Sequence, residues 1–223
     1  MKYLLICAIG ILVQLLFIKV EHDKKYLPAV ILKGIASLIF VVLGFICAQK
    51  SVNTEFARMV KMGLIFGMIG DILLNLRYVF EKKGTLIFLI GILVFLTGHI
   101  FYLLALLPLC TNKLLAFIIG LILTILILIW IFSKIEARMA FKIFGVFYIG
   151  AIVVMSSVAL INYFNNPQTN SLIYLLGAIL FTISDIVLIF NTFGKTSKFY
   201  LRVTNLLLYY LGQLAIALSL LFI

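Results

Sequence analysis

The chain has 223 residues, of which 65% are hydrophobic and only 11% are charged, and its mean hydropathy is +1.31. Soluble domains are about half apolar and a quarter charged, so this composition excludes a soluble globular fold. The formal net charge of +11 is spread over short loops and forms no stripe or motif, which argues against nucleic acid as a partner. We therefore predict an integral membrane protein surrounded by membrane lipids.

Eight apolar segments are long enough to cross a bilayer, at about 20 residues for each helix. Each is a continuous apolar run, whereas the strands of a membrane barrel alternate over about ten residues. The sequence therefore predicts an all-α fold, a polytopic membrane helical bundle that forms one membrane domain over residues 1–223. The expected spans are 2–19, 27–48, 59–80, 85–107, 113–132, 140–163, 171–192 and 199–222.

Lysine and arginine are distributed unevenly between the two ends of the predicted bundle. The loops after the first, third, fifth and seventh spans carry twelve of them, and the opposite end carries five. By the positive-inside rule the richer end faces the cytoplasm, so both termini are predicted to be non-cytoplasmic. The expected location is the cell (inner) membrane, crossed several times by the chain.

The cysteines and histidines form no disulfide or metal-binding pattern. Cys7, Cys47 and Cys110 stand alone in or beside separate spans, without CxxC spacing, and His99 is the one histidine within a span. A metal site needs about three converging ligands, so we expect no metal and no other cofactor. Two carboxylates together with His99 would supply three metal ligands, which is only the minimum number.

The third and seventh spans align without gaps at an offset of 114 residues. Because four spans separate the copies, both run in the same direction across the membrane. This predicts a 4+4 parallel internal repeat, with halves 1–110 and 115–223, and sites in such folds form where the halves meet. The offset places Gly63 on Gly177, Asp71 on Asp185, and Gly98-His99 on Gly212-Gln213.

Four acidic, basic or histidine side chains lie well inside the predicted spans, away from the span ends: Lys33, Asp71, His99 and Asp185. An ionised carboxylate in the bilayer costs at least a few kcal/mol, so each aspartate is expected to face the bundle interior or a wet cavity. Lys33 lies close enough to the basic end either to reach the headgroups or to pair with an aspartate. A purely structural role for the acids, in helix association, stays open at this point.

Polar or adaptable side chains lie at helical spacing from the two aspartates and along other spans. Such a mixture of polar and large apolar groups suits an amphiphile with a polar head and an aliphatic tail. The expected substrate-binding residues are Lys33, Asn75, Tyr78, Tyr102, Tyr148, Ser184, Tyr210 and Gln213.

Two carboxylates are the simplest catalytic machinery that these residues allow. Ser184 and Asp185 are adjacent on one helix and point about 100° apart, which disfavours a serine triad, and no GxSxG elbow is present. One protonated and one ionised carboxyl group can donate a proton to a substrate and deprotonate an attacking water. The same pair also suits a proton-coupled transporter of a small or amphiphilic solute, which would need access from both faces.

The order and spacing of several short motifs resemble the YhhN-like lysoplasmalogenase family. The motifs are Gly70-Asp71-Ile-Leu-Leu74, Gly98-His99-Ile-Phe-Tyr102, Gly177-Ala-Ile-Leu-Phe181, Ser184-Asp185, Lys33 and Tyr210-x-x-Gln213. The resemblance covers nearly the whole chain. It implies a hydrolase that cleaves the vinyl ether bond of lysoplasmalogens, giving a fatty aldehyde and glycerophospho-ethanolamine or -choline.

Under this resemblance, the expected catalytic residues are Asp71, Asp185 and His99. The two aspartates take the acid and base roles in an order that the sequence leaves open. His99 and Lys33 would orient or electrostatically bias them, and Tyr210 and Gln213 would shape the cavity. Head-group and chain preference, the physiological substrate and the oligomeric state are not assigned.

Overall fold

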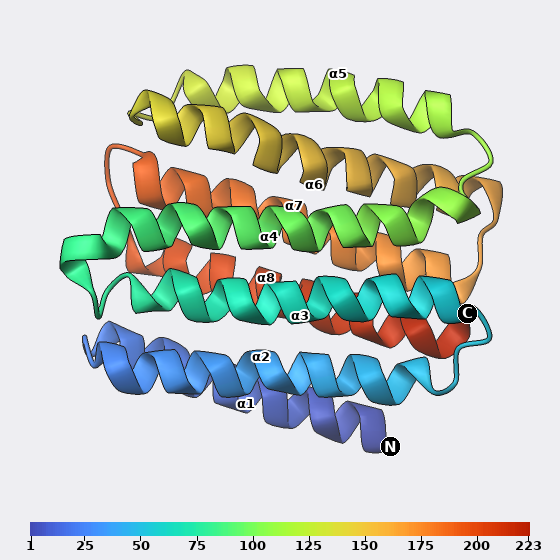
Figure 1. Cartoon of the computed structure of the whole chain (residues 1–223), viewed down its shortest axis with the longest axis horizontal. Helices are drawn as coiled ribbons and strands as arrows, with labels where there is room; N and C mark the ends of the chain where they lie inside the picture. The colour runs from blue at the N-terminus through green and yellow to red at the C-terminus, as the bar shows by residue number, and fades with distance from the viewer.

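The computed structural model describes all 223 residues and consists of eight long helices with no β-sheet (Figure 1). Each helix is long and apolar enough to cross a membrane, which confirms the predicted all-α bundle of eight spans. The helices are α1 (Lys2–His22), α2 (Tyr26–Ala48), α3 (Thr54–Leu76), α4 (Gly84–Leu106), α5 (Lys113–Phe132), α6 (Met139–Asn165), α7 (Thr169–Phe193) and α8 (Phe199–Ser219).

The third helix departs most from its predicted bounds of 59–80. It begins at Thr54, because the Asn53 side chain accepts a hydrogen bond from the backbone N–H of Phe56 at 3.0 Å and caps the helix start. It ends at Leu76, after which the chain turns into a short 3₁₀ helix, Glu81–Lys83. Residues 77 and 78 therefore lie beyond the helix, at the end of the bundle.

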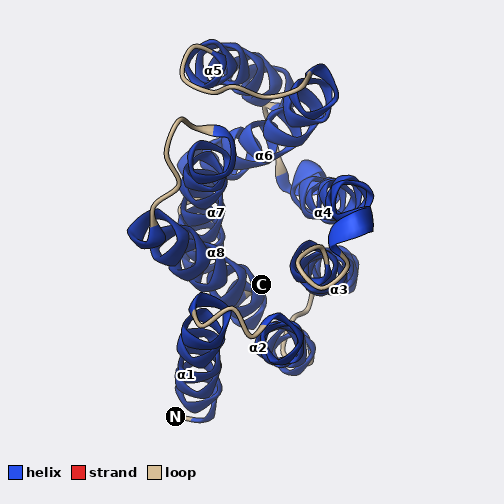
Figure 2. Ribbon diagram, turned by 90° about the vertical axis from the view of Figure 1, so that its left-hand side faces the viewer, coloured by secondary structure: helices blue, strands red, loops and turns tan.

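Contacts between neighbouring helices close a ring of six helices, and the other two lie outside it (Figure 2). In order around the ring, α2 contacts α3, α3 contacts α4, α4 contacts α6, α6 contacts α7, α7 contacts α8, and α8 contacts α2. α1 packs on α2 and α5 packs on α6. A 4+4 repeat requires each helix pairing of the first half to recur in the second half, and these pairings do so. The duplication itself stays a prediction.

Two glycine pairs bring neighbouring helix backbones into close contact. A Cβ atom added to Gly98 of α4 would lie 3.2 Å from the carbonyl oxygen of Gly63 of α3. A Cβ atom added to Gly212 of α8 would lie 2.9 Å from the carbonyl oxygen of Gly177 of α7. Glycine permits this approach because it has no side chain to separate the helices. The α3–α4 and α7–α8 pairs are thereby held tightly together.

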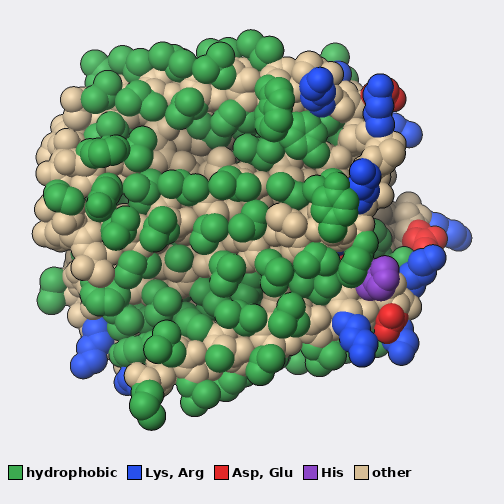
Figure 3. All heavy atoms as spheres, turned by 180° about the vertical axis from the view of Figure 1, so that it is seen from behind, with side chains coloured by type: hydrophobic (Ala, Val, Ile, Leu, Met, Phe, Trp, Pro, Cys, Tyr) green, Lys and Arg blue, Asp and Glu red, His purple; other side chains and the backbone are tan.

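Charged side chains gather at one end of the bundle, and the sides are covered by apolar groups (Figure 3). The charged end contains the loops 23–25, 77–83, 133–138 and 194–198, and we call it the basic end. The opposite end, which holds both termini, is called the far end. The apolar sides are the surface expected of helices in contact with lipid tails.

The contact between α7 and α8 leads to a prediction about stability. Gly212→Ala should lower the melting temperature of the purified protein in detergent, because the new methyl group would meet a backbone carbonyl that cannot rotate away. Overpacking of this kind costs about 1–3 kcal/mol. Gly150→Ala in α6 is the matched control, since its Cβ would meet only Thr124 Cγ2 at 3.7 Å. Equal melting temperatures for the two variants would contradict the assigned packing.

Candidate active site

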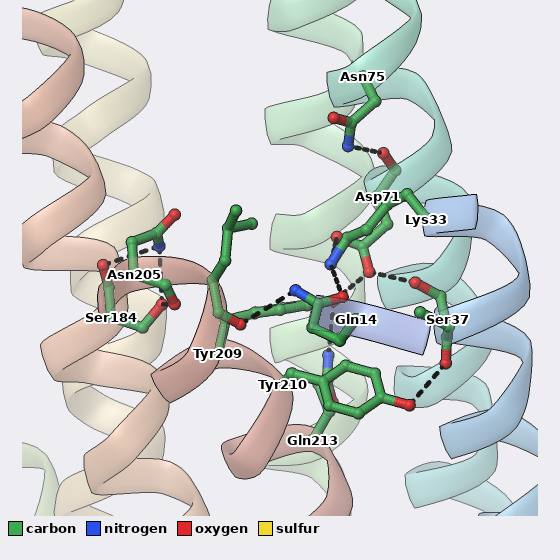
Figure 4. A network of polar contacts seen from close by, with 12 residues as sticks. Gln14, Lys33, Ser37, Asp71, Asn75, Ser184, Asn205, Tyr209, Tyr210 and Gln213 are labelled. Carbon is green, nitrogen blue, oxygen red and sulfur yellow. Dashed lines mark hydrogen bonds and ion pairs between the residues drawn. The ribbon is translucent and has the colours of Figure 1, made fainter. Parts of the chain in front are cut away.

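Asp71 lies buried on α3 at the centre of a polar network (Figure 4). One carboxylate oxygen, Oδ1, is 3.3 Å from the Lys33 ammonium of α2. The other oxygen, Oδ2, accepts hydrogen bonds from the hydroxyl groups of Ser37 at 2.5 Å and Tyr209 at 2.8 Å. Three donors from α2 and α8 therefore surround the carboxylate. A carboxylate has about four lone-pair positions, so one of them is left without a donor.

Lys33 is only 1% exposed, and its ammonium group is fixed from several sides. It donates to Gln14 Oε1 of α1 at 3.4 Å, and it lies 4.6 Å from the centre of the Tyr209 ring. Gln14 in turn donates to the backbone carbonyl of Leu206 at 3.2 Å. Of the two expectations for Lys33, pairing with an aspartate is correct, and the side chain does not extend to the headgroups.

Asp185 of α7 is equally buried but has far fewer partners. Its Oδ2 atom accepts a hydrogen bond from the Tyr148 hydroxyl of α6 at 2.7 Å. No lysine or arginine nitrogen lies within 4 Å of it, and no protein group donates to its Oδ1 atom. The two aspartates thus have unequal surroundings, with a cation beside only one of them.

Both aspartates line one pocket, which we call the polar pocket. The structure therefore brings together the two acids that the sequence singled out, although they lie on α3 and α7. The lining residues are Lys33, Asp71, Leu74, Asn75, Arg77, Phe88, Phe95, Tyr148, Asp185, Leu188, Arg202, Asn205, Leu206 and Tyr209.

A second pocket of about 680 Å³ adjoins the first, and we call it the apolar pocket. Nearly all of its wall is hydrophobic, built by residues of α4, α5, α6 and α7 such as Ile92, Leu128 and Phe141. The residues that line both pockets are Leu74, Phe88, Phe95, Tyr148 and Leu188. Together the two pockets form a cavity with a polar part and an apolar part.

Three of the predicted substrate-binding residues line the polar pocket: Lys33, Asn75 and Tyr148. Asn75 donates to the backbone carbonyl of Asp71 at 2.8 Å, and its own side-chain oxygen has no partner. Tyr78 lies past the end of α3 and lines a separate opening at the basic end. It is therefore placed away from the carboxylates, because the helix stops before it.

The other predicted binding residues form contacts between helices behind the pocket. Gln213 donates to the Tyr209 hydroxyl at 3.2 Å, and Tyr102 donates to Gln213 Oε1 at 2.6 Å. Tyr210 donates to the carbonyl of Ala36 at 2.9 Å. These side chains hold α8 against α2 and α4, and Gln213 donates to the same Tyr209 hydroxyl that bonds Asp71.

Ser184 joins two helices of the second half. Its hydroxyl donates to the Asn205 carbonyl at 3.0 Å, and the Asn205 amide donates back to the Ser184 hydroxyl at 2.9 Å and carbonyl at 3.0 Å (Figure 4). Both residues are buried. The reciprocal bonds tie α7 to α8, and Ser184 is not among the residues that line either pocket.

His99 is 1% exposed and sits among aromatic rings. Its ring centre is 4.5 Å from that of Phe181 and 5.5 Å from that of Tyr148, both in edge-to-face geometry. Neither ring nitrogen has a hydrogen-bond partner. His99 therefore packs behind Tyr148, the tyrosine that bonds Asp185, and its catalytic role stays a prediction.

Sequence reasoning did not select several residues that complete the site: Gln14, Ser37, Arg202, Asn205 and Tyr209. Ser37 lies one helical turn after Lys33, so the same face of α2 carries both. Tyr209 lies one turn after Asn205 and one turn before Gln213 on α8. Spacing alone could have flagged these positions, whereas Gln14 and Arg202 reach the site through contacts that spacing does not reveal.

Fold and site together define a polytopic helical membrane protein in which two buried carboxylates line an amphiphilic cavity. No group of three or more His, Cys, Asp or Glu side chains is arranged to hold a metal ion. The sequence model of the YhhN family matches residues 28–220. The chain belongs to the YhhN family. No curated protein and no solved structure matches the chain significantly.

The buried ion pair leads to a prediction about folding. Lys33→Met should destabilise the protein by about 3–5 kcal/mol, because it leaves the Asp71 charge buried without its cation. Adding Asp71→Asn to Lys33→Met should restore much of the loss, since the uncompensated charge is then removed. Thermal and denaturant unfolding in detergent would measure both effects.

An exposed ion pair supplies the control. Arg58 and Glu55 lie 2.9 Å apart at the start of α3, and both side chains are more than half exposed. Arg58→Met should therefore change the free energy of unfolding by about 1 kcal/mol or less. A Lys33→Met variant as stable as Arg58→Met would show that the buried ion pair does not stabilise the folded protein.

Proposed function

We propose that the protein is a lysoplasmalogenase-type hydrolase, which cleaves the vinyl ether bond of lysoplasmalogens to a fatty aldehyde and a glycerophospho-ethanolamine or -choline. The observation that carries the proposal is the pair of unequal carboxylates on the wall of one pocket, next to an apolar pocket. Membership of the YhhN family supports it. The polar pocket would hold the reacting bond and the apolar pocket the alkenyl chain.

The surroundings of the aspartates suggest which one is the acid. An ammonium group and two hydroxyl groups stabilise Asp71 as a carboxylate. Asp185 has one hydroxyl donor and no cation, and a second negative charge in the same pocket is unfavourable. We therefore assign Asp185 as the protonated acid and Asp71 as the base.

The reaction begins with a proton transfer to carbon. Asp185 donates its proton to the alkene carbon farther from the ether oxygen, which leaves an oxocarbenium ion and the Asp185 carboxylate. A water molecule then attacks the carbon bonded to oxygen, and Asp71 accepts the proton that the water loses. The product of these two steps is a hemiacetal, with Asp71 now protonated.

The hemiacetal then collapses and restores both residues. Asp71 returns its proton to the glycerol oxygen as the carbon–oxygen bond breaks, and Asp185 takes the proton from the hemiacetal hydroxyl. The products are the aldehyde and the free glycerol hydroxyl, and one water has been consumed. No acyl nucleophile is needed, which agrees with the engagement of Ser184 in the contact between α7 and α8.

Packing beyond the site favours hydrolysis over transport. On the far-end side of the polar pocket, Tyr102 and Gln213 are buried and joined by a hydrogen bond, and Gln213 donates to Tyr209 on the pocket wall. A transporter needs access from both faces, whereas an enzyme needs an opening on one side only. The bonded cluster supports one-sided access.

The test is a product assay on the purified protein in detergent. Wild-type protein incubated with a lysoplasmenyl lipid should release fatty aldehyde, and the matched ester-linked lysolipid should release no fatty acid. Asp71→Asn and Asp185→Asn should each lower the rate by at least about 100-fold, the usual contribution of a positioned acid or base. Asp23→Asn, which alters an exposed loop carboxylate, should keep the wild-type rate.

Each variant is accepted only if it elutes as a folded species and melts cooperatively. Fatty acid as the main product would contradict the proposal. So would aldehyde release at the wild-type rate by a folded Asp71→Asn or Asp185→Asn variant.

We also propose that the basic end faces the cytoplasm, because lysine and arginine are retained on that side during insertion. Lys82 lies at the basic end and Lys50 at the far end, and both are exposed. In a chain whose native cysteines are replaced by alanine, a membrane-impermeant maleimide added to intact cells should label Lys50→Cys but not Lys82→Cys. Labelling of Lys82→Cys alone would reverse the orientation.

A further inference from the structure

A third opening lies at the basic end and adjoins the polar pocket. We call it the basic vestibule, and its charged wall is made by Glu21, Lys24, Arg77, Lys198 and Arg202. Arg77 and Arg202 line both the vestibule and the polar pocket. A molecule in the vestibule would therefore be next to the chamber that holds the two aspartates.

The vestibule carries more positive charge than its own acid neutralises. Arg202 is held by Glu21 through two hydrogen bonds, of 3.0 Å from Nε and 2.6 Å from Nη2. No carboxylate oxygen lies within 4 Å of the side-chain nitrogens of Lys24, Arg77 or Lys198. Three cations are thus left without an acidic partner around one opening, which favours an anionic ligand.

Arg77 is the cation without an acidic partner that lines both the vestibule and the polar pocket, and it is held in place by aromatic rings. Its guanidinium carbon lies 4.3 Å from the centre of the Phe88 ring and 4.6 Å from that of Tyr78. Its Nη2 atom donates to the Tyr78 hydroxyl at 2.6 Å, and the Tyr78 ring stacks on Tyr26 with centres 5.4 Å apart. A guanidinium group has five N–H donors, so four are left for a ligand.

We propose that Arg77 binds the phosphate of the lysophospholipid head group in the basic vestibule, with Lys24 and Lys198 adding to the positive field. The inference rests on the proposed function and names the part of the substrate that the vestibule recognises. An arginine held against two aromatic rings suits this task, because the N–H groups of its planar guanidinium can contact two phosphate oxygens at once.

The spacing along α3 agrees with the size of the substrate. Arg77 comes six residues after Asp71, a rise of roughly 9 Å along a helix. In a lysoplasmalogen, five bonds separate the vinyl ether oxygen from phosphorus, a span of roughly 6 Å. A phosphate bound on the inner side of Arg77 would thus leave the vinyl ether beside the carboxylates and the chain in the apolar pocket.

Two ligands test the assignment by binding alone. The first is a 1-O-alkyl glycerophosphocholine, a saturated ether that the proposed reaction cannot cleave, and the second is the 1-O-alkylglycerol of the same chain length, which lacks phosphate. Arg77→Gln in detergent should weaken binding of the phospholipid by at least about tenfold, the loss expected for a charge-assisted hydrogen bond. Its affinity for the alkylglycerol should equal that of wild type. Arg77→Lys should show an intermediate loss for the phospholipid.

Arg58→Gln is the matched control, since it removes an exposed arginine from the other end of the same helix. It should bind both ligands as wild type does. Equal loss of both ligands in Arg77→Gln, or no loss of either, would overturn the proposal, with circular dichroism and melting used to confirm that the variant is folded.

Inorganic phosphate distinguishes a lipid head group from a free anion. If the vestibule serves the head group, millimolar phosphate should compete only weakly with the phospholipid, because the alkyl chain supplies most of the affinity. Binding of phosphate that is tighter than that of the phospholipid, and that is lost in Arg77→Gln, would overturn the head-group assignment. Arg77-dependent phospholipid binding without aldehyde release would instead refute the hydrolase and leave the phosphate site in place.

Discussion

The ion pair between Lys33 and Asp71 is the interaction on which the rest of the structure depends. Two charges inside a membrane bundle are unfavourable unless each meets an opposite charge and further hydrogen bonds. Gln14 holds the ammonium, while Ser37 and Tyr209 complete the carboxylate. Because these groups come from α1, α2, α3 and α8, satisfying one buried carboxylate fixes the relative positions of four helices.

The two halves of the chain differ most around their aspartates. At the predicted offset of 114 residues, Asp71 corresponds to Asp185, but the polar partners of Asp71 correspond to apolar side chains. The polar side chains lie on α2, α3 and α8 and their apolar equivalents lie on α4, α6 and α7, so each half of the chain contributes both polar and apolar groups. The equivalent positions are Lys33 and Phe147, Ser37 and Ala151, Tyr209 and Phe95, Asn75 and Ile189, and Arg202 and Phe88.

Hydropathy predicted the eight helices because apolar length in the membrane is a nearly sufficient signal. The two aspartates were found for the same reason: a charge in an apolar span is conspicuous. The start of α3 was missed because a polar cap at Asn53 begins the helix before the apolar run. Helix ends are set by hydrogen bonds that hydropathy does not register.

The partners of the site were harder to predict than its acids. Whether Lys33 pairs or extends to the headgroups depends on the helix facing it, and Ser184 faces α8 and not the pocket. In the sequence, nothing distinguishes Arg77 from the other basic residues of its loop. Its stacking on Phe88 and Tyr78, and its place between two openings, exist only in the fold.

The order of the vestibule, the polar pocket and the apolar pocket determines where water would meet the lipid in the proposed reaction. The vestibule at the basic end is polar, the middle chamber holds the carboxylates, and the apolar pocket extends toward α5. Arg77 and Arg202 line both the vestibule and the chamber of the carboxylates and would give water a polar route, whereas the wall of the apolar pocket is almost entirely hydrophobic. A chain bound there would place its first carbons at the boundary between the two environments. In the proposed reaction, hydrolysis at that boundary would need water on one side only, so one opening would serve both the head group and water.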